Sequence, residues 1–344
     1  MSKLFKLSVF SAALIAALAT GPASFAQESL EIKNFIGSIT WSNGPISADI
    51  QKNAGKTEIT GGKALIIDGG QTDIDGSDCK STYGRYDFDW FGKKKDGHFG
   101  GYKGMEDLPV LNITVPKTAK LILRDSVVFT DGTPDVAAAD IALSYCGKLT
   151  IGDVEGLLAL DSRGSADVIV GDSGELVANL KGSGDLTGDR SGDVLIQSNG
   201  SADVELGTLR SLELSIHGSG DVEAADIDGA VEIKSHGSGD IELGDVDGSL
   251  SYSGHGSGDL EIVSVEGDYL ELSSHGSGDI DIGGGRVEDL AITVRGSASV
   301  EFSGAANTAN LKASGSGDIS VDRVTGELST KSSGSGDIEV DNRN

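Results

Sequence analysis

The stretch that decides the fold is residues 231–262, VEIKSHGSGDIELGDVDGSLSYSGHGSGDLEI, which contains His-Gly-Ser-Gly-Asp twice. Around the first copy, apolar residues stand two apart, with Val231 and Ile233 before it and Ile241 and Leu243 after it. A period of two is typical of β-strands, because successive side chains of a strand point to opposite faces. The stretch therefore predicts short strands on either side of a glycine-rich turn.

The turn recurs ten times, in the regular repeats of residues 164–344. Its fourth position falls at residues 167, 185, 203, 221, 240, 259, 279, 299, 318 and 337. Units of this length without helical segments are too short for propeller blades. They suit a coil of a parallel β-helix, in which neighbouring coils lie about 4.8 Å apart. We predict an all-β fold, a parallel β-helix (solenoid) with coils of 18–20 residues.

Composition limits the classes of partner. Hydrophobic residues make up 38% of the 344 residues, so the chain can bury a core and wholesale disorder is not expected. Asp and Glu number 54 against 27 Lys and Arg, which gives a formal net charge of -27. Such a charge argues against binding to nucleic acid and to anionic membrane surfaces.

Residues 1–26 have the pattern of a signal peptide. Lys3 and Lys6 precede a short apolar run, and a small residue, Ala26, stands at the expected cleavage point. The apolar run is too short to span a bilayer comfortably, although an uncleaved anchor is the alternative. We expect an exported mature chain, residues 27–344, without a membrane span. It would lie in the periplasm, at the cell surface or in the medium.

The alternating pattern also precedes the regular repeats, for example in Phe35–Trp41. We therefore expect a single β-helix domain over residues 27–344, beginning near residue 28 and interrupted by an insertion at about 79–107. In an oxidising compartment Cys79 and Cys146 are predicted to form a disulfide that pins the base of the insertion. The alternative is two free buried thiols.

Three features resemble a known family. They are the opening LEIKNFIG (residues 30–37), the segment LNITVP (residues 111–116) and the many Gly-Ser-Gly-Asp turns. Together they resemble exported bacterial proteins of the auto-transporter adhesin, head GIN domain family. The resemblance covers most of the mature chain and implies a single-stranded, right-handed parallel β-helix. It carries no functional residue over to this chain.

Four of the five histidines occupy the position just before the turn. They are His217, His236, His255 and His275. In a parallel β-helix they would form a column with neighbours about 5 Å apart. Neutral imidazoles are ligands for transition metals such as Zn²⁺, so the column is a candidate metal site. The alternative is a surface position copied by tandem duplication, without a binding role.

The aspartates at the fourth position of the turn form a second column. Beside the histidines these are Asp221, Asp240, Asp259 and Asp279. Like charges at this spacing repel by roughly 1 kcal/mol per neighbour even in water. Bound Ca²⁺ could relieve that repulsion. The alternative is structural, with each Asp capping its turn by accepting backbone N–H groups.

The insertion combines aromatic and basic side chains within a chain that is otherwise acidic. The candidate binding residues are Tyr83, Tyr86, Phe88, Trp90, Phe91, Lys93, Lys94, Lys95, Phe99 and Tyr102. Aromatic faces with donors nearby suit sugar rings or a protein partner. The alternative is a loop folded back over the rod, hiding apolar surface.

These patterns favour an exported, non-enzymatic β-helix protein of the cell envelope, a structural or adhesion-type binding module for proteins or glycans. Coils of nearly constant length offer no loops to build a catalytic cleft, and no nucleophile or metalloprotease motif occurs. No cofactor is expected, with Ca²⁺ or Zn²⁺ as the candidates otherwise. The alternative functions are a polysaccharide-acting enzyme and a periplasmic divalent-cation-binding protein. Strand edges near Ile338 and Val340 also suggest end-to-end self-association.

Overall fold

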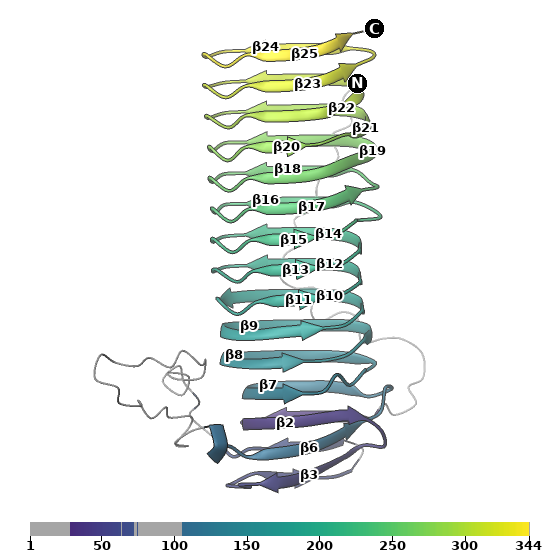
Figure 1. Ribbon diagram of the computed structural model, residues 1–344, viewed down its shortest axis with the longest axis vertical. Coiled ribbons are helices and arrows are strands. Elements are labelled where there is room, and N and C mark those ends of the chain that lie inside the picture. The colour runs from purple at the N-terminus through teal and green to yellow at the C-terminus, as the bar shows by residue number, and fades with distance from the viewer. Residues whose placement is uncertain (1–27, 63, 72–73, 75–104, 344) are drawn as a thin grey trace, which may run out of the picture.

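The structure is a computed structural model that describes residues 28–62, 64–71, 74 and 105–343. Its described part contains no α-helix and forms a β-solenoid of about 12 turns, with parallel coils stacked on one another (Figure 1). The register confirms the predicted coil length. Val194 pairs with Leu212, Leu212 with Val231, and Leu250 with Leu270, steps of 18, 19 and 20 residues.

The first coils hold long strands and a short 3-10 helix. Their bounds are β1 Ser29–Lys33, β2 Ile36–Asn43, β3 Ser47–Lys52, β4 Glu58–Thr60, β5 Ala64–Asp68, η3 Met105–Asp107, β6 Val110–Val115, β7 Lys120–Asp131, β8 Ala138–Thr150 and β9 Val154–Val170.

In the regular repeats, each coil has a strand that leads into the Gly-Ser-Gly-Asp turn and a strand that follows it. The strands before the turn are β10 Ser173–Gly182, β12 Ser191–Ser198, β14 Leu209–Ile216, β16 Val231–Ser235, β18 Leu250–Gly254, β21 Gly285–Val294 and β24 Leu328–Ser332. The strands after the turn are β11 Leu186–Gly188, β13 Val204–Leu206, β15 Val222–Ala224, β17 Ile241–Val246, β20 Ile280–Ile282, β23 Ile319–Val324 and β25 Ile338–Arg343. Two further strands, β19 Leu260–Ser274 and β22 Val300–Ala313, run from one side of the coil to the other.

Alternate residues of each strand form the core. Val231, Leu250, Leu270 and Leu290 stand in one column, since each pairs with the next in register, and all four are buried. Each of these side chains is covered by the coils above and below it. The stability of the rod therefore comes from stacking between neighbouring coils, because a single coil cannot bury its own apolar face.

The turns stack as closely as the strands do. A Cβ added to Gly237 would lie 1.9 Å from the carbonyl oxygen of Gly218, its counterpart in the previous coil. The N–H of Ser238 donates to that same oxygen at 2.9 Å. Glycine at the first position of the turn therefore brings consecutive turns within hydrogen-bonding distance of each other.

The N-terminal end of the rod is closed by antiparallel strands. The coil formed by β5 and β6 lies outside the coil formed by β1 and β2, which pair with β7 on their other side. Strand β4 pairs antiparallel with β5, and β3 pairs antiparallel with β6. The first coil in the sequence is therefore the second coil of the rod. Strands β3 and β4 cover the edge that the outermost coil, β5 and β6, would otherwise leave open, and Figure 1 shows β3 beyond β6.

The predicted insertion lies mostly outside the described residues. Its last three residues, Met105–Asp107, form η3. Cys146 is 1% exposed and packs with Ile36, Leu108 and Val127. Its pairing with Cys79 stays a prediction, because Cys79 is not among the described residues.

Candidate functional site

The in-register stacking of coils brings the four histidines into one column. The ring centroids of His217 and His236 are 4.8 Å apart, those of His236 and His255 are 4.8 Å apart, and those of His255 and His275 are 4.6 Å apart. The planes of neighbouring rings differ by only 1° to 4°. We call these four side chains the His column. Their predicted position in one column is what the structure shows.

The backbone of the previous coil holds each histidine in place. The N–H of His236 donates to the carbonyl of Ile216 at 2.9 Å, and the N–H of His255 donates to that of Ser235 at 2.8 Å. Because these bonds repeat the strand register through the turn, the imidazoles keep nearly the spacing of the strands.

Arg295 follows His275 in the same position of the next coil. Its Nη1 donates to Nε2 of His275, which makes that nitrogen an acceptor. The other ring nitrogen of His275, Nδ1, is buried and has no hydrogen-bond partner among the described residues. His275 therefore differs from the other three histidines, because the guanidinium group of Arg295 already occupies its Nε2.

Burial and the neighbouring rings favour neutral imidazoles. Partial desolvation of this exposed ring is the main cause that lowers the pKa of His236, and His217 and His255 lower it further. Burial also lowers the pKa of His275, with smaller contributions from His255 and Arg295. At neutral pH both rings are therefore in the uncharged form, which is the form that ligates metals.

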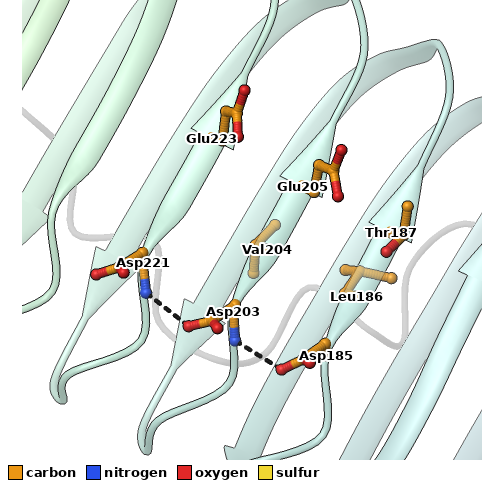
Figure 2. Close-up of a pocket in the computed structure, with 8 residues that line it drawn as sticks. All are labelled: Asp185, Leu186, Thr187, Asp203, Val204, Glu205, Asp221 and Glu223. Atoms are coloured by element: carbon orange, nitrogen blue, oxygen red, sulfur yellow. Dashed lines mark hydrogen bonds between the residues drawn. The ribbon is translucent and has the colours of Figure 1, made fainter.

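The aspartates of the turns form hydrogen bonds between coils. The N–H of Asp203 donates to Oδ1 of Asp185 at 3.1 Å, and the N–H of Asp221 donates to Oδ1 of Asp203 at 2.9 Å (Figure 2). The series continues through Asp240 and Asp259 at 2.9 Å and Asp279 at 2.8 Å. We call these side chains, with Asp167, the Asp column. Each carboxylate accepts a backbone N–H, as the structural alternative predicted, but the donor belongs to the next coil.

The Asp column brings like charges close together. Burial raises the pKa of the Asp185 carboxyl, and Asp167 and Asp203 raise it further, while the hydrogen bond from the Asp203 N–H opposes the shift. The hydrogen bonds and the repulsion therefore have opposite effects on stability.

A second acidic column runs beside the first. Thr187 pairs with Glu205, and Glu205 with Glu223, two residues after the corresponding aspartates. Between the two columns lies a groove of about 320 Å³, lined by Asp185, Leu186, Thr187, Asp203, Val204, Glu205, Asp221 and Glu223 (Figure 2). Sequence reasoning missed the second column. Its signal was a Glu two positions after four successive aspartates of the turns, which gives Glu205, Glu223, Glu242 and Glu261.

Neither the His column nor the Asp column forms a conventional metal site. In the described part of the chain, no three side chains of His, Cys, Asp or Glu come together in a way that could hold a metal ion. In the His column the rings are parallel, so their lone pairs run side by side and do not converge. Binding of Ca²⁺ or Zn²⁺ stays a prediction.

Within the described ranges, no helix is long and apolar enough to cross a membrane.

The ten aromatic and lysine residues predicted to bind a partner, between Tyr83 and Tyr102, lie outside the described residues. Their role stays a prediction.

Comparison with known protein families finds a match to the regular repeats. A family model described as "Putative auto-transporter adhesin, head GIN domain" matches residues 148–264 and 249–344, more than half of the chain. Comparison with curated proteins and with solved structures found no match. The first matched segment begins within β8, the second begins just before β18, and together they cover every Gly-Ser-Gly-Asp turn.

Proposed function

Because the chain belongs to the auto-transporter adhesin, head GIN domain family, we propose that it is an exported, non-enzymatic protein of the cell envelope. In this proposal it acts as a structural or adhesion-type binding module. Its partners would be proteins or glycans. The predicted signal peptide, residues 1–26, supports export, and cell fractionation would distinguish the periplasm from the surface and the medium.

The observation that carries the proposal is the uniformity of the coils. From β9 to β25, each strand pairs in parallel with the equivalent strand of the next coil, and paired residues are 18 to 20 positions apart in the sequence. Enzymes built on a β-helix need loops that extend from several coils to enclose a substrate. The described coils of this part of the chain are joined by short turns, and the residues that line their groove include no Lys, Arg or His.

A rod of this kind is suited to holding a contact surface away from its base. About 12 turns at a spacing of about 4.8 Å give a length of roughly 55 Å. Hydrogen bonds link every turn of the regular repeats to the previous one. Such a rod is stiff, so the protein loses little conformational entropy when it binds a partner.

A glycan array, together with an array of envelope proteins, tests the proposal. The exported full chain would be compared with a variant that lacks residues 84–102. We expect saturable binding by the full chain and loss of binding on deletion. Equal binding by both proteins would indicate that the contact surface lies on the rod and not in the insertion. Absence of binding by the full chain would count against an adhesion role.

A further inference from the structure

We propose that three imidazoles of the His column, those of His217, His236 and His255, bind a borderline transition-metal ion such as Zn²⁺ in neighbouring pairs, with His236 as the ligand shared between the other two. This inference does not depend on the adhesion role. It concerns pairs of ligands, with water completing the coordination of the ion, and so it does not require three protein groups that already converge.

The spacing of the rings is close to what a chelating pair needs. Zn²⁺ binds imidazole nitrogen at about 2.0–2.1 Å in a tetrahedral arrangement, which places two ligand nitrogens about 3.4 Å apart. The ring centroid of His236 lies 4.8 Å from the ring centroid of His217 and 4.8 Å from that of His255. For equivalent nitrogens that stand as far apart as the centroids, each has to move about 0.7 Å towards its neighbour. The parallel rings also have to tilt towards each other, so that both lone pairs point at the ion. All three side chains are exposed, so small rotations of the rings can supply this movement.

The structure also selects which part of the column binds. His236 has an imidazole on both sides, and so it can form a pair with either His217 or His255. His275 has His255 on one side, but its Nε2 is held by the guanidinium group of Arg295. A metal ion at His275 would have to displace this contact and lie beside a positive charge.

The charge of the chain also favours a cation at this position. The chain has a formal net charge of -27, which raises the concentration of cations near its surface. Imidazole selects Zn²⁺, Ni²⁺ or Cu²⁺ over Ca²⁺, which prefers oxygen ligands.

Calorimetric titration of the full chain with ZnCl₂ tests the proposal, with His236→Gln and His275→Gln as a matched pair. Both variants remove an imidazole from the same stack. We expect His236→Gln to weaken Zn²⁺ binding by about tenfold or more and His275→Gln to change it by less than about twofold. Titration with CaCl₂ should be unaffected by either variant.

Histidine ring NMR shifts of the unaltered protein give an independent readout that does not depend on the folding of a variant. On addition of ZnCl₂, the signals of His217, His236 and His255 should move, and those of His275 should not. Equal weakening by the two variants would overturn the assignment of His236 as the shared ligand. Unchanged histidine signals, or Zn²⁺ binding that persists in His236→Gln, would overturn the site itself.

Discussion

Replacement of Asp203 by Asn or by Ala separates the two effects of a carboxylate in the Asp column. Oδ1 of Asp203 accepts the N–H of Asp221 at 2.9 Å. The backbone N–H of residue 203 donates to Asp185 at 3.1 Å, and this bond persists in both variants. Asn keeps an acceptor oxygen without the charge, whereas Ala removes the acceptor and the charge together.

The two variants should differ by about 1 kcal/mol. A hydrogen bond to an ionised acceptor contributes about 1.5–3 kcal/mol, and the lower end applies to this exposed side chain. Repulsion from the two neighbouring carboxylates costs roughly 1 kcal/mol each in water and less in salt. Ala loses the bond and relieves the repulsion, so these changes nearly cancel. Asn relieves the same repulsion and retains a neutral hydrogen bond of about 1 kcal/mol.

Urea unfolding of the full chain followed by circular dichroism measures this difference, with hydrogen exchange at the Asp221 amide as a local probe. Exchange is needed because long repeat arrays need not unfold in one step. We expect Asp203→Asn to be at least as stable as the unaltered protein, and the Asp221 amide to exchange faster in Asp203→Ala alone. Equal midpoints and equal exchange in the two variants would refute the role of the carboxylate as an acceptor.

Three other substitutions test the stacking of the coils. Gly237→Ala should destabilise the rod by about 2 kcal/mol or more in urea unfolding, because its Cβ would overlap the Gly218 carbonyl. Gly284→Ala, where a Cβ meets nothing within 4 Å, should have little effect. Leu272→Ala should cost about 2–5 kcal/mol by the same measurement, since the side chain is buried between coils. Because the pKa of His236 is lowered in the folded protein, this histidine takes up a proton at a higher pH in the unfolded chain than in the folded one. Stability should therefore decline below about pH 6.5. In His236→Gln the unfolding midpoint should depend less steeply on pH, and an unchanged slope would count against this account.

The regular repeats could be predicted because their determinants are local. Alternation at Val231, Ile233, Ile241 and Leu243 indicates strands, and the recurrence of the turn fixes the register between coils. The expected spacing of the His column, about 5 Å, follows from that register and agrees with the observed 4.6 to 4.8 Å. Stacking of identical units leaves few alternative arrangements.

The N-terminal end could not be predicted in the same way. The alternation in Ser47–Lys52 does not encode whether the strand pairs parallel or antiparallel, and its partner β6 is more than 50 residues away in the sequence. The turn sequence Asn43-Gly44-Pro45 was a signal that the chain reverses before β3. The donor to each carboxylate of the Asp column was also beyond local reasoning, because it is contributed by the next coil.

The proposed adhesion role requires that this rod binds a partner and does not transform it. The most direct measurement incubates the exported full chain with a panel of envelope and extracellular polysaccharides. It records both the retained protein and the release of new reducing ends. We expect saturable retention on at least one glycan, with reducing ends at the level of the buffer control. Release of reducing ends that grows with protein concentration would contradict the claim and identify the chain as a polysaccharide-acting enzyme.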